Sequence, residues 1–216
     1  MLDPVGGMCS VVTFMNSISI LCWNARGLNG RARRDAVRTL VQSERPHIVC
    51  IIETKLQDVP QLLIASMLGM NFVEYAFLPA MGTCGGIIVA AQQPDVRIDD
   101  VHIGCFSVTV WVHSGTQDGH PSWWLTTVYG PQDDNDKVLF LEELSAVRDA
   151  CPGPWAIIGD FNLILDEADK NNAATQEDSV WIQLGQPVVI SHRDPNKGFY
   201  CRIWHVHFSM ENRIAL

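Results

Sequence analysis

The chain has 216 residues, of which 47% are hydrophobic and 18% are charged, a balance typical of a folded, soluble protein. This composition excludes an intrinsically disordered, collagen-like or low-complexity protein, and the length suffices for one domain with a substantial core. The formal net charge of −9 argues against a protein that holds nucleic acid by its overall charge. Binding to a polyanion would therefore require a local basic cluster or a bound cation.

Seven cysteines are dispersed along the chain without a Cys-x-x-Cys pair. Cys22 and Cys50 lie inside apolar runs, which favours buried free thiols and predicts an intracellular protein in a reducing compartment. Residues 1–16 show no periodicity and lack the basic region of a signal peptide, so we expect a loose leader there. The apolar run over 11–23 is interrupted by polar residues and is too short to span a bilayer.

From residue 18 onward, apolar runs alternate with amphipathic stretches. Residues 18–23 and 47–52 read as buried strands, and residues 31–44 predict a helix that Pro46 ends. A second helix is expected to follow Asp58, which can cap it. The expected inner faces are Ala36, Val37, Leu40 and Val41 in the first helix and Val59, Leu62, Leu63, Ser66 and Met70 in the second.

The middle of the chain predicts a β-rich region. Five further strands are expected, at 72–78, 86–91, 96–103, 106–112 and 123–129. A helix over 136–150 and a buried strand over 155–158 follow; the helix is expected to bury Phe140, Leu141, Leu144 and Val147. After about residue 175 the regular alternation stops, although short apolar runs remain. The pattern of strands and helices predicts an α/β fold.

Polar side chains follow four of the predicted strands. Asn24, Glu53 and Tyr129 each come at the end of an apolar run, and Asp160 and Asn162 follow the last one. Open α/β sheets bind ligands beyond the carboxyl ends of their strands, so these residues can converge on one site. Two carboxylates and two carboxamides form an all-oxygen set of ligands, which suits Mg²⁺. Taken singly, each residue also has a structural explanation as a solvated or turn-forming residue.

The runs CWNARGLN, IVCIIETKL, CGGIIVAA, TTVYGP and IIGDFNLIL resemble, in this order and at these intervals, the endonuclease/exonuclease/phosphatase superfamily. The likeness is closest to the endonuclease domain of LINE-type (non-LTR) retrotransposon polyproteins, which cuts target DNA to prime reverse transcription. Asp169, Lys170, Asn171 and Asn172 strengthen that narrower resemblance. It implies a DNase I-like sandwich of two mixed β-sheets with helices outside, a partial domain over 17–175 with an incomplete second sheet, and a divergent tail over 176–216.

The resemblance also implies an activity, the hydrolysis of phosphodiester bonds in DNA with Mg²⁺ or Mn²⁺ as cofactor. Glu53 would be the principal metal ligand, with Asn24 beside it. Tyr129 would lie next to the scissile phosphate, Asp160 would orient or deprotonate the attacking water, and Asn162 would hold a phosphate oxygen. The implied partner is DNA, which is compatible with a nuclear location; we expect neither a membrane nor a small-molecule cofactor.

One local cluster of basic residues stands out against the acidic background. Its members are Arg26, Arg31, Arg33, Arg34 and Arg38, and Arg26, Arg31 and Arg34 are predicted to contact nucleic acid. The alternative for these residues is an ordinary solvated helix face.

The chain departs from the family pattern near its end. The family closes its site with a late Ser-Asp-His motif, whose histidine donates to the phosphate, and this chain contains no such run. The segment from Ser191 to Asp194 has similar letters in the wrong order, so His192 is not expected to be that histidine. Cys201, His205 and His207 lack a fourth ligand and the spacing of a zinc site. We therefore expect inefficient turnover, and an unpaired edge at strand 155–158.

Two alternatives remain open. The first is another enzyme of the same superfamily, a phosphomonoesterase acting on inositol phosphates or a sphingomyelinase-like phosphodiesterase. The second is a non-catalytic remnant of a retroelement with at most weak DNA binding, which the missing Ser-Asp-His motif favours.

Overall fold

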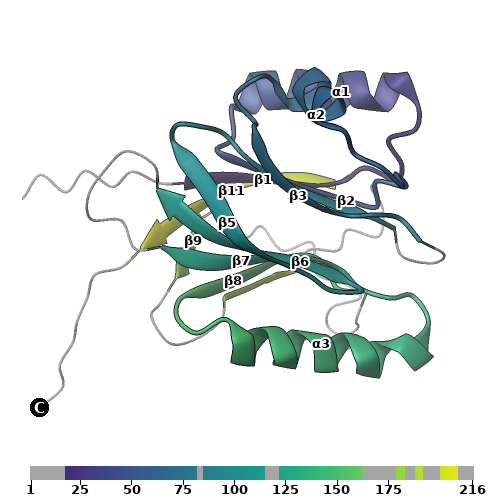
Figure 1. Cartoon of the computed structure of the whole chain (residues 1–216), viewed down its shortest axis with the longest axis vertical. Helices are drawn as coiled ribbons and strands as arrows, with labels where there is room; N and C mark the ends of the chain where they lie inside the picture. The colour runs from purple at the N-terminus through teal and green to yellow at the C-terminus, as the bar shows by residue number, and fades with distance from the viewer. Residues whose placement is uncertain are drawn as a thin grey trace, which may run out of the picture.

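The computed structural model describes residues 18–81, 85–114 and 122–162, and the backbone of three later strands at 179–182, 188–191 and 200–208. Two mixed β-sheets pack face to face, with helices on both outer faces (Figure 1). This arrangement confirms the predicted α/β sandwich with helices outside. The expected leader, residues 1–16, lies outside the described residues.

The first sheet has six strands in the order β3-β4-β2-β1-β11-β9. The strands are β1 (Ile18–Asn24), β2 (Ile48–Ile52), β3 (Glu74–Leu78), β4 (Ile87–Ala91), β9 (Ser179–Ile182) and β11 (Tyr200–Phe208). β1 runs parallel to β2 on one side and antiparallel to β11 on the other. The strand that carries Asn24 is therefore internal to the sheet.

The second sheet has five strands in the order β10-β8-β7-β6-β5. The strands are β5 (Val96–Ile103), β6 (Ser107–Ser114), β7 (Trp123–Tyr129), β8 (Trp155–Asp160) and β10 (Val188–Ser191). The expectation of an unpaired edge at β8 is wrong, because β10 runs parallel to it with Val188 opposite Ala156. A short apolar run distant in sequence supplies the neighbour that local patterning did not predict.

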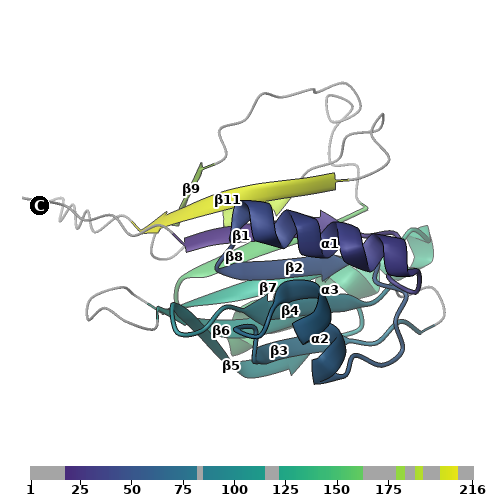
Figure 2. The same ribbon diagram turned by 90° about the horizontal axis from the view of Figure 1, so that it is seen from above.

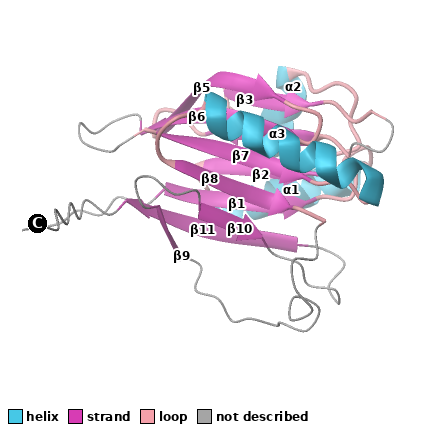
Figure 3. Ribbon diagram, turned by 90° about the horizontal axis from the view of Figure 1, so that it is seen from below, coloured by secondary structure: helices cyan, strands magenta, loops and turns pink. Residues whose placement is uncertain are grey.

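Three helices cover the outer faces. α1 (Arg31–Glu44) and α2 (Gln61–Leu68) pack on the first sheet (Figure 2). α3 (Lys137–Ala150) packs on the second sheet (Figure 3). It follows the 3₁₀ turn η1 (Asp134–Asp136). None of these described helices is long and apolar enough to cross a membrane.

The inner faces of the helices agree with the sequence only in part. α1 buries Val37 and Val41 as expected, whereas Ala36 is exposed. For α2 the predicted face is wrong, because Leu62 is 81% exposed and Ile64, Met67 and Leu68 are buried instead. Met70, which is 78% exposed, lies beyond the end of this helix. In α3, Phe140 is buried and Leu141 is exposed. α2 is apolar almost all round, so its sequence did not define one face.

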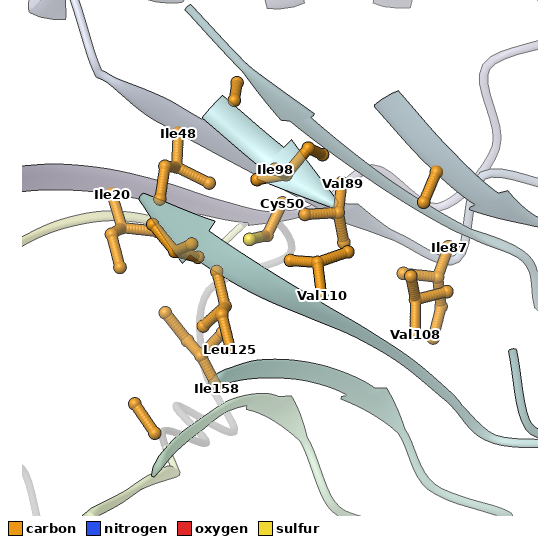
Figure 4. Close-up of a cluster of buried hydrophobic side chains, with 14 of the residues drawn as sticks. Ile20, Ile48, Cys50, Ile87, Val89, Ile98, Val108, Val110, Leu125 and Ile158 are labelled. Carbon is orange, nitrogen blue, oxygen red and sulfur yellow. The ribbon is translucent and has the colours of Figure 1, made fainter. Parts of the chain in front are cut away.

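The core between the sheets is made of aliphatic side chains that alternate along their strands. Figure 4 shows Ile20, Ile48 and Val89 of the first sheet meeting Val110 and Leu125 of the second. Cys50 is fully buried among them, and burial raises the pKa of its thiol to about 12. This thiol therefore stays protonated and unreactive, as expected for a buried free cysteine.

A buried hydrogen-bond chain links three strands of the second sheet. Thr109 and Thr126 are register partners whose hydroxyl oxygens lie 2.8 Å apart. The indole N–H of Trp155 donates to the Thr126 hydroxyl at 2.8 Å, which satisfies this polar group inside the sheet. The chain ties β6, β7 and β8 together beneath α3.

Candidate active site

The polar strand ends come together because the strands that carry them are parallel neighbours. Asn24 pairs with Ile52, the residue before Glu53, at the ends of β1 and β2. Tyr129 pairs with Asp160 at the ends of β7 and β8. The structure thus places two pairs of the predicted residues at the carboxyl ends of their strands, one pair in each sheet.

Glu53 and Tyr129 join the two sheets. The Tyr129 side chain is buried, and its hydroxyl hydrogen-bonds the Glu53 carboxylate. Burial raises the pKa of Tyr129 to about 12, and the negative charges of Glu53 and Asp160 raise it in the same direction. The phenol therefore stays protonated at neutral pH and acts as a hydrogen-bond donor.

A tight turn after β8 fixes Asp160 and Asn162. The Asp160 carboxylate accepts the Asn162 backbone N–H at 3.0 Å, and the Asn162 amide donates to the Gly130 carbonyl at 2.7 Å. The Gly130 N–H donates in turn to the Asp160 carbonyl at 2.7 Å. One amide hydrogen of Asn162 is thus used to hold the turn against the end of β7.

Several residues around the site have a left-handed backbone. Arg26, Glu53, Lys55 and Asn162 have φ between 48° and 55°, a region that costs a non-glycine residue about 1–3 kcal/mol. Backbone hydrogen bonds hold these conformations: Gly27 N–H donates to the Glu53 carbonyl at 2.7 Å, and Lys55 N–H donates to the Gly85 carbonyl at 2.8 Å. Such strain is typical of functional sites, where surrounding structure imposes an otherwise unfavourable geometry.

Gly85 makes room for the Glu53–Tyr129 pair. A Cβ at this position would lie 2.6 Å from Cε1 of the Tyr129 ring and 3.1 Å from the Cα of Glu53. Only glycine allows β4 to begin this close to both residues. The sequence contains the signal in the Gly85-Gly86 pair before β4, but the pattern alone does not show what the glycines contact.

A cavity of about 330 Å³ opens beside this pair. Its lining consists of Glu53, Lys55, Phe106, Tyr129, Gly130, Pro131, Gln132, Asp133 and Asp136. The Lys55 ammonium adds a positive charge to this lining, and it lies 3.7 Å from the Glu53 carboxylate. Sequence reasoning missed Phe106, Gln132, Asp133 and Asp136 because no motif marks them.

Asn24 lies at the edge of this assembly. Its side-chain oxygen accepts the Arg26 backbone N–H at 3.2 Å, and the residue is absent from the lining of the cavity. The strand register brings it next to Glu53 rather than next to Tyr129.

Most arginines of the basic cluster form hydrogen bonds or ion pairs within the protein. The Arg33 and Arg34 guanidinium groups donate to backbone carbonyls of residues 25–29, and Arg38 donates to the Ser66 carbonyl. Arg31 is exposed and pairs with Asp35 at 3.6 Å. Arg26 is exposed in the loop that follows Asn24. Contact of Arg26, Arg31 and Arg34 with nucleic acid stays a prediction.

The donor groups around Glu53 fit a hard divalent cation. Among the residues that the structure describes, no group of three or more His, Cys, Asp and Glu side chains is arranged to hold a metal. Mg²⁺ needs only one or two protein carboxylates, because waters and substrate phosphates complete its shell. One carboxylate at Glu53 with a neighbouring carboxamide fits this chemistry, and the described lining residues include no cysteine or histidine.

Several predicted residues cannot be placed at this site. His192 and residues 169–172 lie outside the described residues. Cys201, His205 and His207 lie on β11, which is described only in its backbone.

Comparison with known proteins decides the family. The model of the endonuclease/exonuclease/phosphatase family matches residues 21–208. The chain belongs to the endonuclease/exonuclease/phosphatase family. No curated protein matches it.

Solved structures with the same fold are distant in sequence. An AP endonuclease from Archaeoglobus fulgidus has 17% identity and a TM-score of 0.53, over 70% of this chain and 60% of that one. ANGEL2, a 2′,3′-cyclic phosphatase, has 10% identity and a TM-score of 0.52, over 69% and 54%. TDP2 of D. rerio, complexed with a single-strand DNA product, has 17% identity and a TM-score of 0.49, over 69% and 62%. The matched region thus spans less than two thirds of each of these three structures.

Proposed function

We propose that this chain is a divalent-metal-dependent phosphodiesterase that cleaves DNA, of the LINE endonuclease type. The observation that carries the proposal is the Glu53–Tyr129 contact, with Asp160 beside Tyr129 in register. A carboxylate for a cation, a protonated phenol and a second carboxylate for water suit metal-assisted phosphodiester hydrolysis. The LINE-type assignment rests on the sequence runs CWNARGLN and DKNN.

Glu53 and Asn24 would hold Mg²⁺ or Mn²⁺. When bound, the cation polarises a phosphoryl oxygen and offsets the charge that develops at phosphorus. With that charge balanced, the carboxylates of Glu53 and Asp160 would no longer repel a polyanion.

The chain's own residues perform the remaining steps. The Tyr129 hydroxyl, protonated at neutral pH, gives its one hydrogen to the Glu53 carboxylate and so orients this ligand beside the scissile phosphate. Asp160, held by the turn to Asn162, orients the attacking water and accepts its proton. The second amide hydrogen of Asn162 donates to a phosphate oxygen.

Turnover is expected to be slow, because the sequence has no Ser-Asp-His motif. Loss of one preorganised donor to a developing oxyanion typically lowers the rate by about 100- to 1,000-fold. This absence favours a second candidate, a non-catalytic remnant of a retroelement.

A plasmid-nicking assay tests the proposal. Supercoiled plasmid is incubated with the protein with and without Mg²⁺, beside Glu53→Gln, Asp160→Asn and the exposed-acid control Glu142→Gln. Metal-dependent nicking that survives only in the wild type and the control supports a DNA endonuclease. Absence of nicking in the wild type would support the remnant. Hydrolysis of inositol phosphates without nicking would instead assign the chain to another branch of the superfamily.

A further inference from the structure

Phe106 forms an aromatic wall of the cavity beside Tyr129. The residue lies in the short connection between β5 and β6 and is half-buried. Its ring packs edge to face on Phe140 with centroids 5.7 Å apart, and Phe140 packs on Phe161 at 6.1 Å. The cluster of buried side chains beneath α3 therefore supports one side of the ring, while the residue also lines the cavity.

The backbone of Phe106 is fixed from two sides. The Glu143 carboxylate of α3 accepts the Cys105 N–H at 2.8 Å, the Phe106 N–H at 3.2 Å and the Ser107 hydroxyl at 2.5 Å. On the other side the Phe106 carbonyl accepts the Tyr129 N–H at 3.0 Å. A ring held in advance loses little freedom when a ligand stacks on it.

The hydrogen bonds between this loop and the Glu143 carboxylate require glycine at position 104. A Cβ at Gly104 would lie 2.1 Å from Oε1 of Glu143, so the carboxylate reaches the loop only because this residue has no side chain. Hydrogen bonds thus hold the loop between β5 and β6 against both α3 and Tyr129.

The other residues that line the cavity determine which kind of ligand fits it. Pro131 adds apolar surface beside Phe106, whereas Gln132, Asp133 and Asp136 supply hydrogen-bond acceptors. The carboxylates disfavour a further phosphate at this wall. A volume of about 330 Å³ lies within the usual range of ligand pockets, which is about 300–1,000 Å³. A planar, uncharged group with amino hydrogens fits both kinds of surface.

We propose that this cavity is a nucleobase subsite in which Phe106 stacks on the base of the nucleotide attached to the scissile phosphate. Gln132, Asp133 and Asp136 supply the acceptors for the two hydrogens of that base's exocyclic amino group. This inference rests on the proposed function, since the phosphate itself would lie at Glu53 and Tyr129.

A pair of chromogenic phosphodiesters tests the subsite through catalysis. Deoxycytidine 5′-(p-nitrophenyl phosphate) and methyl p-nitrophenyl phosphate have the same reacting bond, and only the first carries a base. Stacking on one aromatic side chain corresponds to about 5- to 150-fold in affinity. Phe106→Ala should raise KM for the nucleoside ester by a factor in this range and leave the methyl ester unchanged. Equal effects on both esters would overturn the subsite.

A binding measurement separates the subsite from the activity. Stacking quenches the fluorescence of 2-aminopurine deoxyribonucleotide, whose amino group suits the acceptors, so the wild type should quench it with saturation. Phe106→Trp should retain the quenching, and Phe106→Leu, which preserves apolar packing, should lose it. Quenching without hydrolysis of either ester would reject the proposed function and keep the subsite. Absence of saturable quenching in the wild type would reject the subsite, whatever the enzyme hydrolyses.

Discussion

Tyr129 and Asp160 are register partners at the carboxyl ends of two parallel strands. Adjacent strands lie about 4.8 Å apart, so the phenol and the carboxylate emerge side by side at one edge of the second sheet. Glu53 approaches the same phenol from the first sheet. The site therefore forms where the ends of the two sheets meet, and its parts depend on the packing between them.

Glu53→Gln should abolish metal-dependent cleavage, because an amide is a much weaker ligand for a hard cation than a carboxylate. We expect a fall of at least about 100-fold in rate. The same change should lower the pKa of Tyr129, since the Glu53 charge helps to raise it. Absorbance at the phenolate wavelength across the alkaline range measures this shift without any substrate. An unchanged Tyr129 titration would contradict the Glu53–Tyr129 contact.

Asp160→Asn should lower kcat by about 100- to 10,000-fold, the usual contribution of a positioned general base. KM should change little, because asparagine can still accept the Asn162 N–H that holds the turn. Steady-state kinetics on a chromogenic phosphodiester separate the two parameters. A rise in KM at constant kcat would mean that Asp160 binds substrate and does not act on water.

Tyr129→Phe should make the protein less sensitive to alkali. The pKa of Tyr129 is about 12 in the folded chain against 10.0 for an ordinary tyrosine, so the folded state binds this proton more tightly. The resulting stability is fully present below about pH 10 and is lost as the pH rises toward 12. Urea unfolding at pH 9, 10 and 11 should therefore show a smaller loss of stability in Tyr129→Phe than in the wild type. Equal losses of stability in the two proteins would contradict a raised pKa of Tyr129.

Gly85→Ala should impair the site while the remainder of the fold persists. The added methyl group would press on the Tyr129 ring at 2.6 Å and on the Glu53 Cα at 3.1 Å. We expect a loss of about 100-fold in rate, as is usual when catalytic groups move by about 1 Å. Gly30→Ala is the matched control, because no atom lies within 4 Å of a Cβ there. Equal activity in the two variants would show that the close approach is unimportant.

Thr126→Val should destabilise the fold by about 1–3 kcal/mol, because it leaves the buried Trp155 indole N–H without its acceptor. Valine preserves the shape, so the effect isolates the hydrogen bonds. The exposed Thr39→Val on α1 should change stability by no more than about 0.5 kcal/mol. Free energies of unfolding from urea titrations compare the two. A cost for Thr126→Val as small as that of the control would mean that the indole finds another partner.

The sequence predicted well those features that depend on local pattern. β1, β2, β7 and β8 appear where their apolar runs lie, and parallel pairing brings their polar ends together in two pairs, one in each sheet. α1 has its predicted bounds because Pro46 and the apolar spacing define it.

Features that depend on contacts between distant segments were not predictable in this way. The pairing of β10 with β8 joins short apolar runs separated by an irregular stretch, and register cannot be read from either run alone. Phe106 was expected to begin the strand over 106–112. Instead β6 starts at Ser107, and Phe106 packs beneath α3 because Glu143 fixes the loop that precedes the strand.

The late position of β10 and β11 in the chain has a consequence during synthesis. β11 completes the edge of β1, where Ile18 is opposite Val206, and β10 completes the edge of β8. At about 5–20 residues per second, β1 would leave the ribosome roughly 10 to 40 seconds before its partner is made. In that interval the edge of β1, which carries Asn24, stays open. β8, which carries Asp160, precedes β10 by only about 30 residues, so its edge stays open for roughly 1.5 to 6 seconds. Such open edges make the nascent chain a substrate for chaperones. Both sheets reach their final strand order only when the last strands emerge.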